Sequence, residues 1–150
     1  MSVFFQFESE FVDALHCIPM IVRFKLDTCG VKLKLVHWNQ FTPEERKVLV
    51  VMPCETPKES QEYKDFLQAL ITDKTGSPAG ELPIDSNPFW LDDKTIPDQV
   101  QEKAAEFEIN LSLEQWEKLT PIQRFALIKL SRSSHENRNF YPALQEFQLI

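Results

Sequence analysis

Apolar residues recur at helical spacing in the segment "DQVQEKAAEFEINLSL" (98–113), where Val100, Ala104 and Phe107 fall on one side of a helix. The Gln, Glu, Lys and Ala residues around them are strong helix formers. The earlier segment "MIVRFKLDTCGVKLKL" (20–35) instead alternates enough for a β-hairpin that turns at Cys29-Gly30. Taken alone, this second segment leaves helix and hairpin both open.

An internal repeat favours the helix. Shifting the chain by 78 residues against itself aligns residues 18–71 with residues 96–149 without a gap, with twelve identical pairs. Rare Trp, Pro and Arg residues fall in register, which indicates a duplication. The pairs are Ile18 and Ile96, Pro19 and Pro97, Val22 and Val100, Lys25 and Lys103, Leu33 and Leu111, Leu35 and Leu113, Trp38 and Trp116, Thr42 and Thr120, Pro43 and Pro121, Arg46 and Arg124, Leu49 and Leu127, and Tyr63 and Tyr141.

Four helices are predicted in each copy. If both copies share a fold, Pro19 stands at the first helical position of the first helix and Gly30 just past its end. Capping boxes, in which Ser or Thr is followed three residues later by Glu or Gln, are predicted at Thr42, Thr56, Ser112 and Thr120. The helices are predicted at 19–29, 34–41, 43–52, 57–72, 97–107, 112–119 and 121–132, followed by a C-terminal pair broken at Pro142.

The predicted fold class is therefore all-α, with two tandem copies of a roughly four-helix unit packed as one domain over residues 1–150. The Pro- and Gly-containing connection carries Phe89 and Trp90, which predict that it packs across the body, because a free linker would expose both rings. The parts are copy one (18–71), a connecting strap (72–95) and copy two (96–149).

Composition and cysteine usage indicate a soluble globular protein of the cytoplasm. The chain is 150 residues long and 43% hydrophobic, and its longest apolar run, "VLVVM", is too short to cross a bilayer. It begins with acidic residues where a signal peptide would be basic. Cys17, Cys29 and Cys54 show no CxxC spacing and are predicted to be free thiols.

The net charge of −7 disfavours a binder of nucleic acid or of an anionic membrane, since both need a positive field. The charge is unevenly distributed. Residues 98–117 hold six acids and one base, whereas residues 118–138 hold five bases and one acid.

Residues that the two copies share are best explained by the shared fold. Trp38 and Trp116 are predicted to be core anchors whose indole N–H groups bond to the backbone. Arg46 and Arg124 lie in helices that are apolar nearly all round, so each is predicted to make a partly buried structural ion pair or a helix-end contact.

The copies differ most in "SRSSHENRNF" (131–140), which has no counterpart in copy one. One interpretation is a solvated loop with Ser133 or Ser134 capping a helix. The other is a docking surface, in which Arg side chains grip carboxylates or phosphates and His and Asn read backbone polar groups. The candidate partner-binding residues are Arg132, His135, Asn137, Arg138 and Asn139.

No spacing in the sequence indicates catalysis. If 19–29 is a helix, Cys17 and Cys29 stand about 18 Å apart and cannot share a metal ion. Zinc spacings, a Gly-rich phosphate loop and a nucleophile elbow are missing from the sequence. We expect neither enzyme activity, nor a cofactor, nor a metal.

Three segments, "FFQFESEFV", "CIPMIVRFKLDTCGVKLKL" and "LTPIQRFALIKLSRSSHENRNFYPALQEF", resemble the cyanobacterial nitrate reductase-associated proteins. The resemblance runs from Phe4 to about Leu149. It implies an accessory role in making or keeping assimilatory nitrate reductase active, for example in its maturation or in delivery of its molybdenum cofactor or iron–sulfur cluster. It implies no catalytic residues.

The resemblance makes nitrate reductase the expected partner, bound through the 131–140 stretch and the Phe-Trp strap. Two other functions stay open. A regulatory module could sense a small anion between the copies. A thiol redox protein could use Cys17, Cys29 or Cys54.

Overall fold

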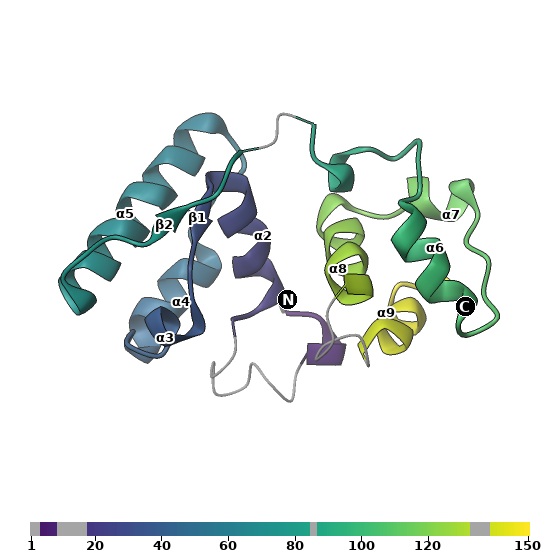
Figure 1. Ribbon diagram of the computed structural model, residues 1–150, viewed down its shortest axis with the longest axis horizontal. Coiled ribbons are helices and arrows are strands. Elements are labelled where there is room, and N and C mark those ends of the chain that lie inside the picture. The colour runs from purple at the N-terminus through teal and green to yellow at the C-terminus, as the bar shows by residue number, and fades with distance from the viewer. Residues whose placement is uncertain (1–3, 9–17, 85–86, 133–138) are drawn as a thin grey trace. The chain divides into compact units, whose positions relative to one another are not determined.

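The computed structural model divides the chain into two compact units, unit 1 (Met1–Asp85) and unit 2 (Ser86–Ile150) (Figure 1). Both units are mainly helical, which confirms the predicted helical class, although the described part also holds one small sheet. The boundary between the units lies inside the predicted strap, and the packing of both copies as one domain stays a prediction. No helix in the described part is long and apolar enough to span a membrane. The structure describes residues 4–8, 18–84, 87–132 and 139–150.

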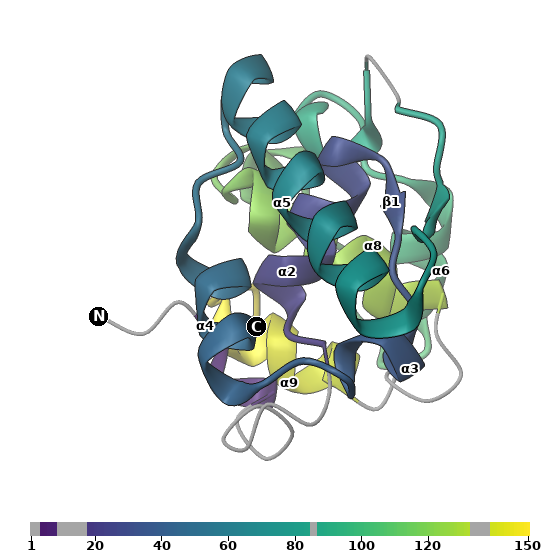
Figure 2. The ribbon, with the colours of Figure 1, turned by 90° about the vertical axis from the view of Figure 1, so that its left-hand side faces the viewer.

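Unit 1 is built on two helices that pack against each other. The described elements are η1 (Gln6–Glu8), α2 (Met20–Cys29), β1 (Val31–Lys32), α3 (Leu35–Trp38), α4 (Pro43–Val51), α5 (Pro57–Thr75) and β2 (Gly80–Glu81). Figure 2 shows α5 lying across α2, and these two helices are in contact. The strands β1 and β2 pair antiparallel, with Val31 opposite Glu81. The end of α2 is thereby tied to the chain that follows α5.

Unit 2 is organised around one central helix. Its described elements are η2 (Phe89–Leu91), α6 (Asp98–Ala105), α7 (Leu113–Glu117), α8 (Pro121–Arg132) and α9 (Phe140–Glu146). Helix α8 contacts η2, α6 and α9. Its run from Arg124 to Ile128 is buried without interruption, so the helix is covered on nearly every side.

All four predicted capping boxes are present. At Thr42 the hydroxyl accepts from the Glu45 backbone N–H at 3.2 Å, and Glu45 Oε1 accepts from the Thr42 N–H at 2.7 Å. These exchanges satisfy N–H groups that a helix start leaves without partners. The same exchange joins Thr56 with Glu59, Ser112 with Gln115 and Thr120 with Gln123.

Residues 20–29 form a helix, so the hairpin alternative is wrong. Helix α2 buries Val22, Leu26 and Cys29, a helical spacing, and ends at Gly30. Gly30 has φ +79°, and its N–H donates to the Leu26 carbonyl at 2.8 Å. A side-chain carbon at Gly30 would lie 2.8 Å from the Leu82 carbonyl oxygen, so only glycine fits this turn.

The prediction of a break at Pro142 is wrong. Pro142 is the third residue of α9, which continues to Glu146. The backbone nitrogens of a first turn have no partner within the helix, so proline costs no hydrogen bond there. The helix expected before Pro142 falls largely in 133–138, outside the described residues.

Three helix pairs begin 78 residues apart, which is the spacing of the sequence repeat. They are α2 and α6, α3 and α7, and α4 and α8. The fourth pair differs, because α5 is long and α9 is short. The duplication itself stays a prediction.

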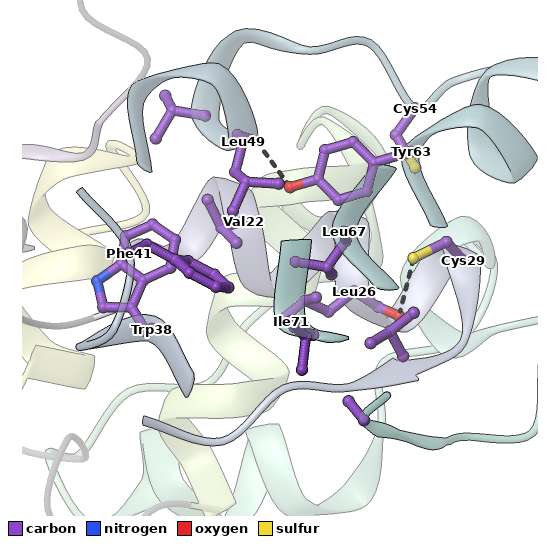
Figure 3. Packing of buried hydrophobic residues seen from close by; sticks show 13 residues of the cluster. Val22, Leu26, Cys29, Trp38, Phe41, Leu49, Cys54, Tyr63, Leu67 and Ile71 are labelled. Atoms are coloured by element: carbon purple, nitrogen blue, oxygen red, sulfur yellow. Dashed lines mark hydrogen bonds between the residues drawn. The ribbon is translucent and has the colours of Figure 1, made fainter. Parts of the chain in front are cut away.

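The core of unit 1 gathers side chains from α2, α4 and α5 (Figure 3). Trp38 and Tyr63 are among its largest fully buried residues. The Tyr63 hydroxyl donates to the Leu49 carbonyl at 2.7 Å, which gives its buried oxygen a partner. Cys29 and Cys54 belong to the same core.

Candidate functional site

Two of the five candidate partner-binding residues lie at the ends of the connection between α8 and α9. Arg132 is the last residue of α8 and is exposed, and half-buried Asn139 stands directly before α9. The other three, His135, Asn137 and Arg138, lie outside the described residues. The docking interpretation of 131–140 therefore stays a prediction.

In unit 2, Arg124 fixes the strap to the central helix. Its Nε donates to the Trp90 carbonyl at 2.7 Å, and its Nη1 donates to the carbonyls of Leu119 at 2.5 Å and Trp116 at 3.4 Å. The Trp90 ring also meets the Phe125 ring edge to face, with centroids 5.1 Å apart. One buried guanidinium thus joins η2, the end of α7 and α8.

Trp116 supplies a second attachment of the strap. Its indole Nε1–H donates to the Asp92 carbonyl at 3.1 Å, while its ring is buried. On the surface, Lys94 Nζ lies 3.5 Å from a carboxylate oxygen of Glu117. Two residues on the body of unit 2 therefore hold the backbone on either side of Leu91.

These attachments present two apolar side chains to solvent. Phe89 and Leu91 each expose 56% of their surface, and we call this pair the η2 ridge. The expectation that the strap packs across the body holds for half-buried Trp90 but is wrong for Phe89. A three-residue 3₁₀ turn with Trp90 facing inward leaves its neighbours facing outward.

The positive charge of the Arg124 guanidinium is buried and needs compensation by nearby groups. Arg124 exposes only 5% of its surface, and this burial lowers the pKa of its side chain, whereas the carboxylates of Asp93 and Asp92 act in the opposite direction. Three carbonyl acceptors and two nearby carboxylates compensate the buried charge. The arrangement serves to position the strap, and it shows no reactive group.

An exposed aromatic pair, Phe107 and Tyr141, also lies in unit 2. The ring centroids are 5.1 Å apart, and both residues are more than a third exposed. Lys103 Nζ lies 5.9 Å from the Phe107 centroid and pairs with Glu106 at 3.3 Å. The helix predicted at 97–107 ends earlier, because α6 stops at Ala105, and Phe107 lies beyond its end with 39% of its surface exposed.

The matching residues of unit 1 act more locally. Trp38 is buried, and Arg46 donates from Nε to the Trp38 carbonyl at 3.2 Å and from Nη2 to the Asn39 carbonyl at 3.4 Å. The guanidinium carbon of Arg46 lies 5.8 Å from the Trp38 ring centroid. Arg46 is half-buried and closes the turn between α3 and α4. The role of these residues as repeat anchors stays a prediction.

Unit 1 brings together a group of ionisable side chains that no sequence spacing indicates. Lys25 Nζ donates to the carbonyls of Val50 and Met52, each at 2.6 Å, and burial lowers the pKa of Lys25. Cys54 lies beside this ammonium and Cys29 lies beside Cys54, and Lys25 Nζ stands 5.7 Å from the Tyr63 ring centroid. Among the described residues, no three His, Cys, Asp or Glu side chains form a metal-binding group. Cys17 lies outside them.

Comparison with known proteins identified one relationship. A family model described as conserved nitrate reductase-associated protein matches residues 4–147 of the chain. No curated protein and no solved structure matched.

Proposed function

Because the chain belongs to the conserved nitrate reductase-associated protein family, we propose that it is a non-catalytic accessory factor that binds nitrate reductase directly. The family description associates its members with that enzyme. In this proposal the protein acts during maturation of the reductase, while the enzyme takes up its molybdenum cofactor and iron–sulfur cluster, and it is required for active enzyme.

The η2 ridge is the observation that carries direct binding. Exposed Phe and Leu side chains on a fixed backbone bind a partner with little loss of conformational freedom, since their position is set beforehand. Arg124 and Trp116 provide that fixation through hydrogen bonds to the backbone at Trp90 and Asp92. The ridge supplies the apolar part of the proposed interface.

Arg132 supplies a polar part of the same interface. It lies eight residues beyond Arg124 on α8, about 12 Å along the helix axis. An interface of this type combines an apolar centre with a polar rim, where an Arg side chain pairs with a carboxylate of the partner. The proposed partner surface is therefore apolar with acidic residues at its margin.

Capture of purified nitrate reductase on the immobilised full chain tests direct binding. The variant Phe89→Ser with Leu91→Ser removes the ridge, and we expect at least about a tenfold loss of affinity, as for an interface anchor. The matched control is Val48→Ser with Val51→Ser on α4, because these residues are exposed apolar side chains of unit 1. Equal binding by the ridge variant and the control would contradict the assignment of the ridge.

The polar rim is tested separately. Arg132→Ala combined with Arg138→Ala should weaken capture and leave the melting temperature nearly unchanged, since Arg132 is exposed. Lys58→Ala combined with Lys118→Ala is the charge-matched control, because both lysines are well exposed. A large drop in melting temperature in the arginine variant would instead indicate a structural role.

The accessory role is tested on the enzyme itself. We expect nitrate reductase made without this protein to show low activity and a low molybdenum content, and both to recover when the wild-type chain is restored. Recovery by the ridge variant to the wild-type level would refute a role that depends on the ridge. Full activity and full metal content without the protein would refute the maturation role.

A further inference from the structure

Two cysteines that are distant in sequence meet in the core of unit 1. Cys29 is the last residue of α2, and Cys54 lies in the connection between α4 and α5, with twenty-four residues between them. Both thiols interact with each other, and both residues are buried. Figure 3 shows the Cys54 sulfur directed toward the end of α2, where Cys29 lies.

Each thiol also faces the backbone of α2. The Cys29 thiol donates to the Leu26 carbonyl and the Cys54 thiol to the Lys25 carbonyl, each over 3.8 Å. These are long, weak contacts, which the thiols can leave at little cost. Lys25 brings a positive charge beside Cys54, and its ammonium is held in place by the carbonyls of Val50 and Met52.

The two thiols differ in acidity. The neighbouring Cys29 thiol is the largest cause that lowers the pKa of Cys54, and Ser60 and the charge of Lys25 act in the same direction, whereas burial raises this pKa. The partner thiol shows the opposite effect, because the neighbouring Cys54 thiol and burial raise the pKa of Cys29. Cys54 stands beside the Lys25 ammonium, which favours attack by this thiol rather than by Cys29.

We propose that Cys29 and Cys54 are a peroxide-responsive dithiol that forms a reversible disulfide within unit 1. Cys54 lies in a non-helical connection and is 5% exposed, and in this proposal hydrogen peroxide enters there. The oxidant is a peroxide and the reductant that restores the pair is a dithiol. This proposal is independent of binding to nitrate reductase.

The reaction balances in two steps. The Cys54 thiolate attacks a peroxide oxygen, the O–O bond breaks, and sulfenic acid and hydroxide result. The hydroxide takes the Cys29 proton and becomes water, and the Cys29 thiolate attacks the Cys54 sulfur. The S–O bond of the sulfenic acid then breaks, the disulfide forms, and the released hydroxide becomes the second water with the proton that Cys54 lost on ionising. In sum, two thiols and one hydrogen peroxide give one disulfide and two waters, and a dithiol returns the pair to thiols by exchange.

The test uses the full chain with Cys17→Ser, so that only the pair remains. The protein is exposed to hydrogen peroxide at a dose that oxidises free glutathione, and the remaining thiols are then alkylated and mapped by peptide mass spectrometry. We expect both thiols to disappear together, a peptide linked through 29 and 54, a monomer on non-reducing gels, and full recovery after treatment with dithiothreitol. Wild-type protein treated in parallel should give the same linked peptide.

Single-thiol variants in the same background test the order of events. With Cys29→Ser, Cys54 should stop at a sulfenic acid that a dimedone reagent traps. With Cys54→Ser, Cys29 should react at least about tenfold more slowly, because it keeps its proton. Circular dichroism verifies folding, and the linked peptide of the two-thiol chain decides the proposal if a variant fails to fold. Unreacted thiols, or cross-linked dimers without the 29–54 link, would overturn it.

Discussion

Four equivalent positions of the predicted repeat are buried in unit 1, whereas in unit 2 they lie largely at the surface. We call these four positions the corner of each unit. In unit 1 the corner is formed by Lys25, Cys29, Cys54 and Tyr63, all of which are buried. The lysine bonds to backbone carbonyls and the tyrosine hydroxyl to Leu49, so the corner is part of the core.

The residues at the corresponding positions of unit 2, 78 residues later, are Lys103, Phe107, Arg132 and Tyr141. Here the two rings lie against each other at the surface, Arg132 is exposed, and Lys103 pairs with Glu106. Two of the four residues are identical between the units, yet their surroundings are different. A shared residue therefore does not carry a shared role, and the chemistry of each unit depends on what surrounds it.

Replacing the paired tyrosines gives the largest expected contrast. Tyr63→Ala should lower the free energy of unfolding by about 4 kcal/mol, because it opens a cavity in the core and removes the hydrogen bond to Leu49. Tyr141→Ala should lower it by less than about 1 kcal/mol, since that ring is partly exposed. Urea unfolding followed by circular dichroism measures both. Similar losses of unfolding free energy in the two variants would contradict the difference in burial between the two tyrosines.

The paired arginines should differ by a smaller amount. Arg124→Ala leaves the buried carbonyls of Trp90 and Leu119 without their donor, so a loss of about 3 kcal/mol is expected. Arg46→Ala should cost about 1 kcal/mol, because Arg46 is half-buried and closes only a local turn. Trp fluorescence during unfolding reports on both. Arg124→Lys keeps the charge but not the forked geometry, and should recover only part of the loss.

The capping boxes give the smallest contrast, and one that depends on pH. The Thr42 N–H and the nearby Lys74 lower the pKa of Glu45, so its contribution to stability is present above the ordinary value of 4.5 and is lost as pH falls through the lowered value. Gln123 holds the same place in unit 2 and cannot ionise. Glu45→Gln should remove an acid-dependent change of under about 1 kcal/mol, and Gln123→Glu should add one. Thermal melts between pH 3 and about 7 measure the difference.

Local chemistry made much of the fold predictable. Side chains at Thr42 and Thr120 satisfy N–H groups three residues away, so the sequence contains both partners of the contact. The signal that ends α2 is also local, because Gly30 adopts the left-handed backbone conformation without strain. Pro142 was misread because a proline breaks a helix only beyond its first turn, and the start of α9 has no capping signal in sequence.

Contacts between distant segments were not predictable in the same way. The pairing of β1 with β2 joins two-residue strands 48 residues apart in the chain, too short to leave an alternating pattern. The meeting of Cys29 with Cys54 depends on how α2, α4 and α5 pack, which no spacing encodes. Packing of the strap was predictable, because an adjacent pair of apolar rings indicates a packed segment. The sequence does not indicate which of the two rings faces inward.

The attachment of the strap by Arg124 also has a consequence for how the chain is made. Trp90 leaves the ribosome 34 residues before Arg124 does, and the hydrogen bond between them cannot form until α8 has been synthesised. A chain truncated before α8 would contain Phe89, Leu91 and the Trp116 donor, but it would lack the Arg124 donor that holds the Trp90 carbonyl. During translation, the surface proposed to meet the reductase is therefore completed only when unit 2 is nearly whole.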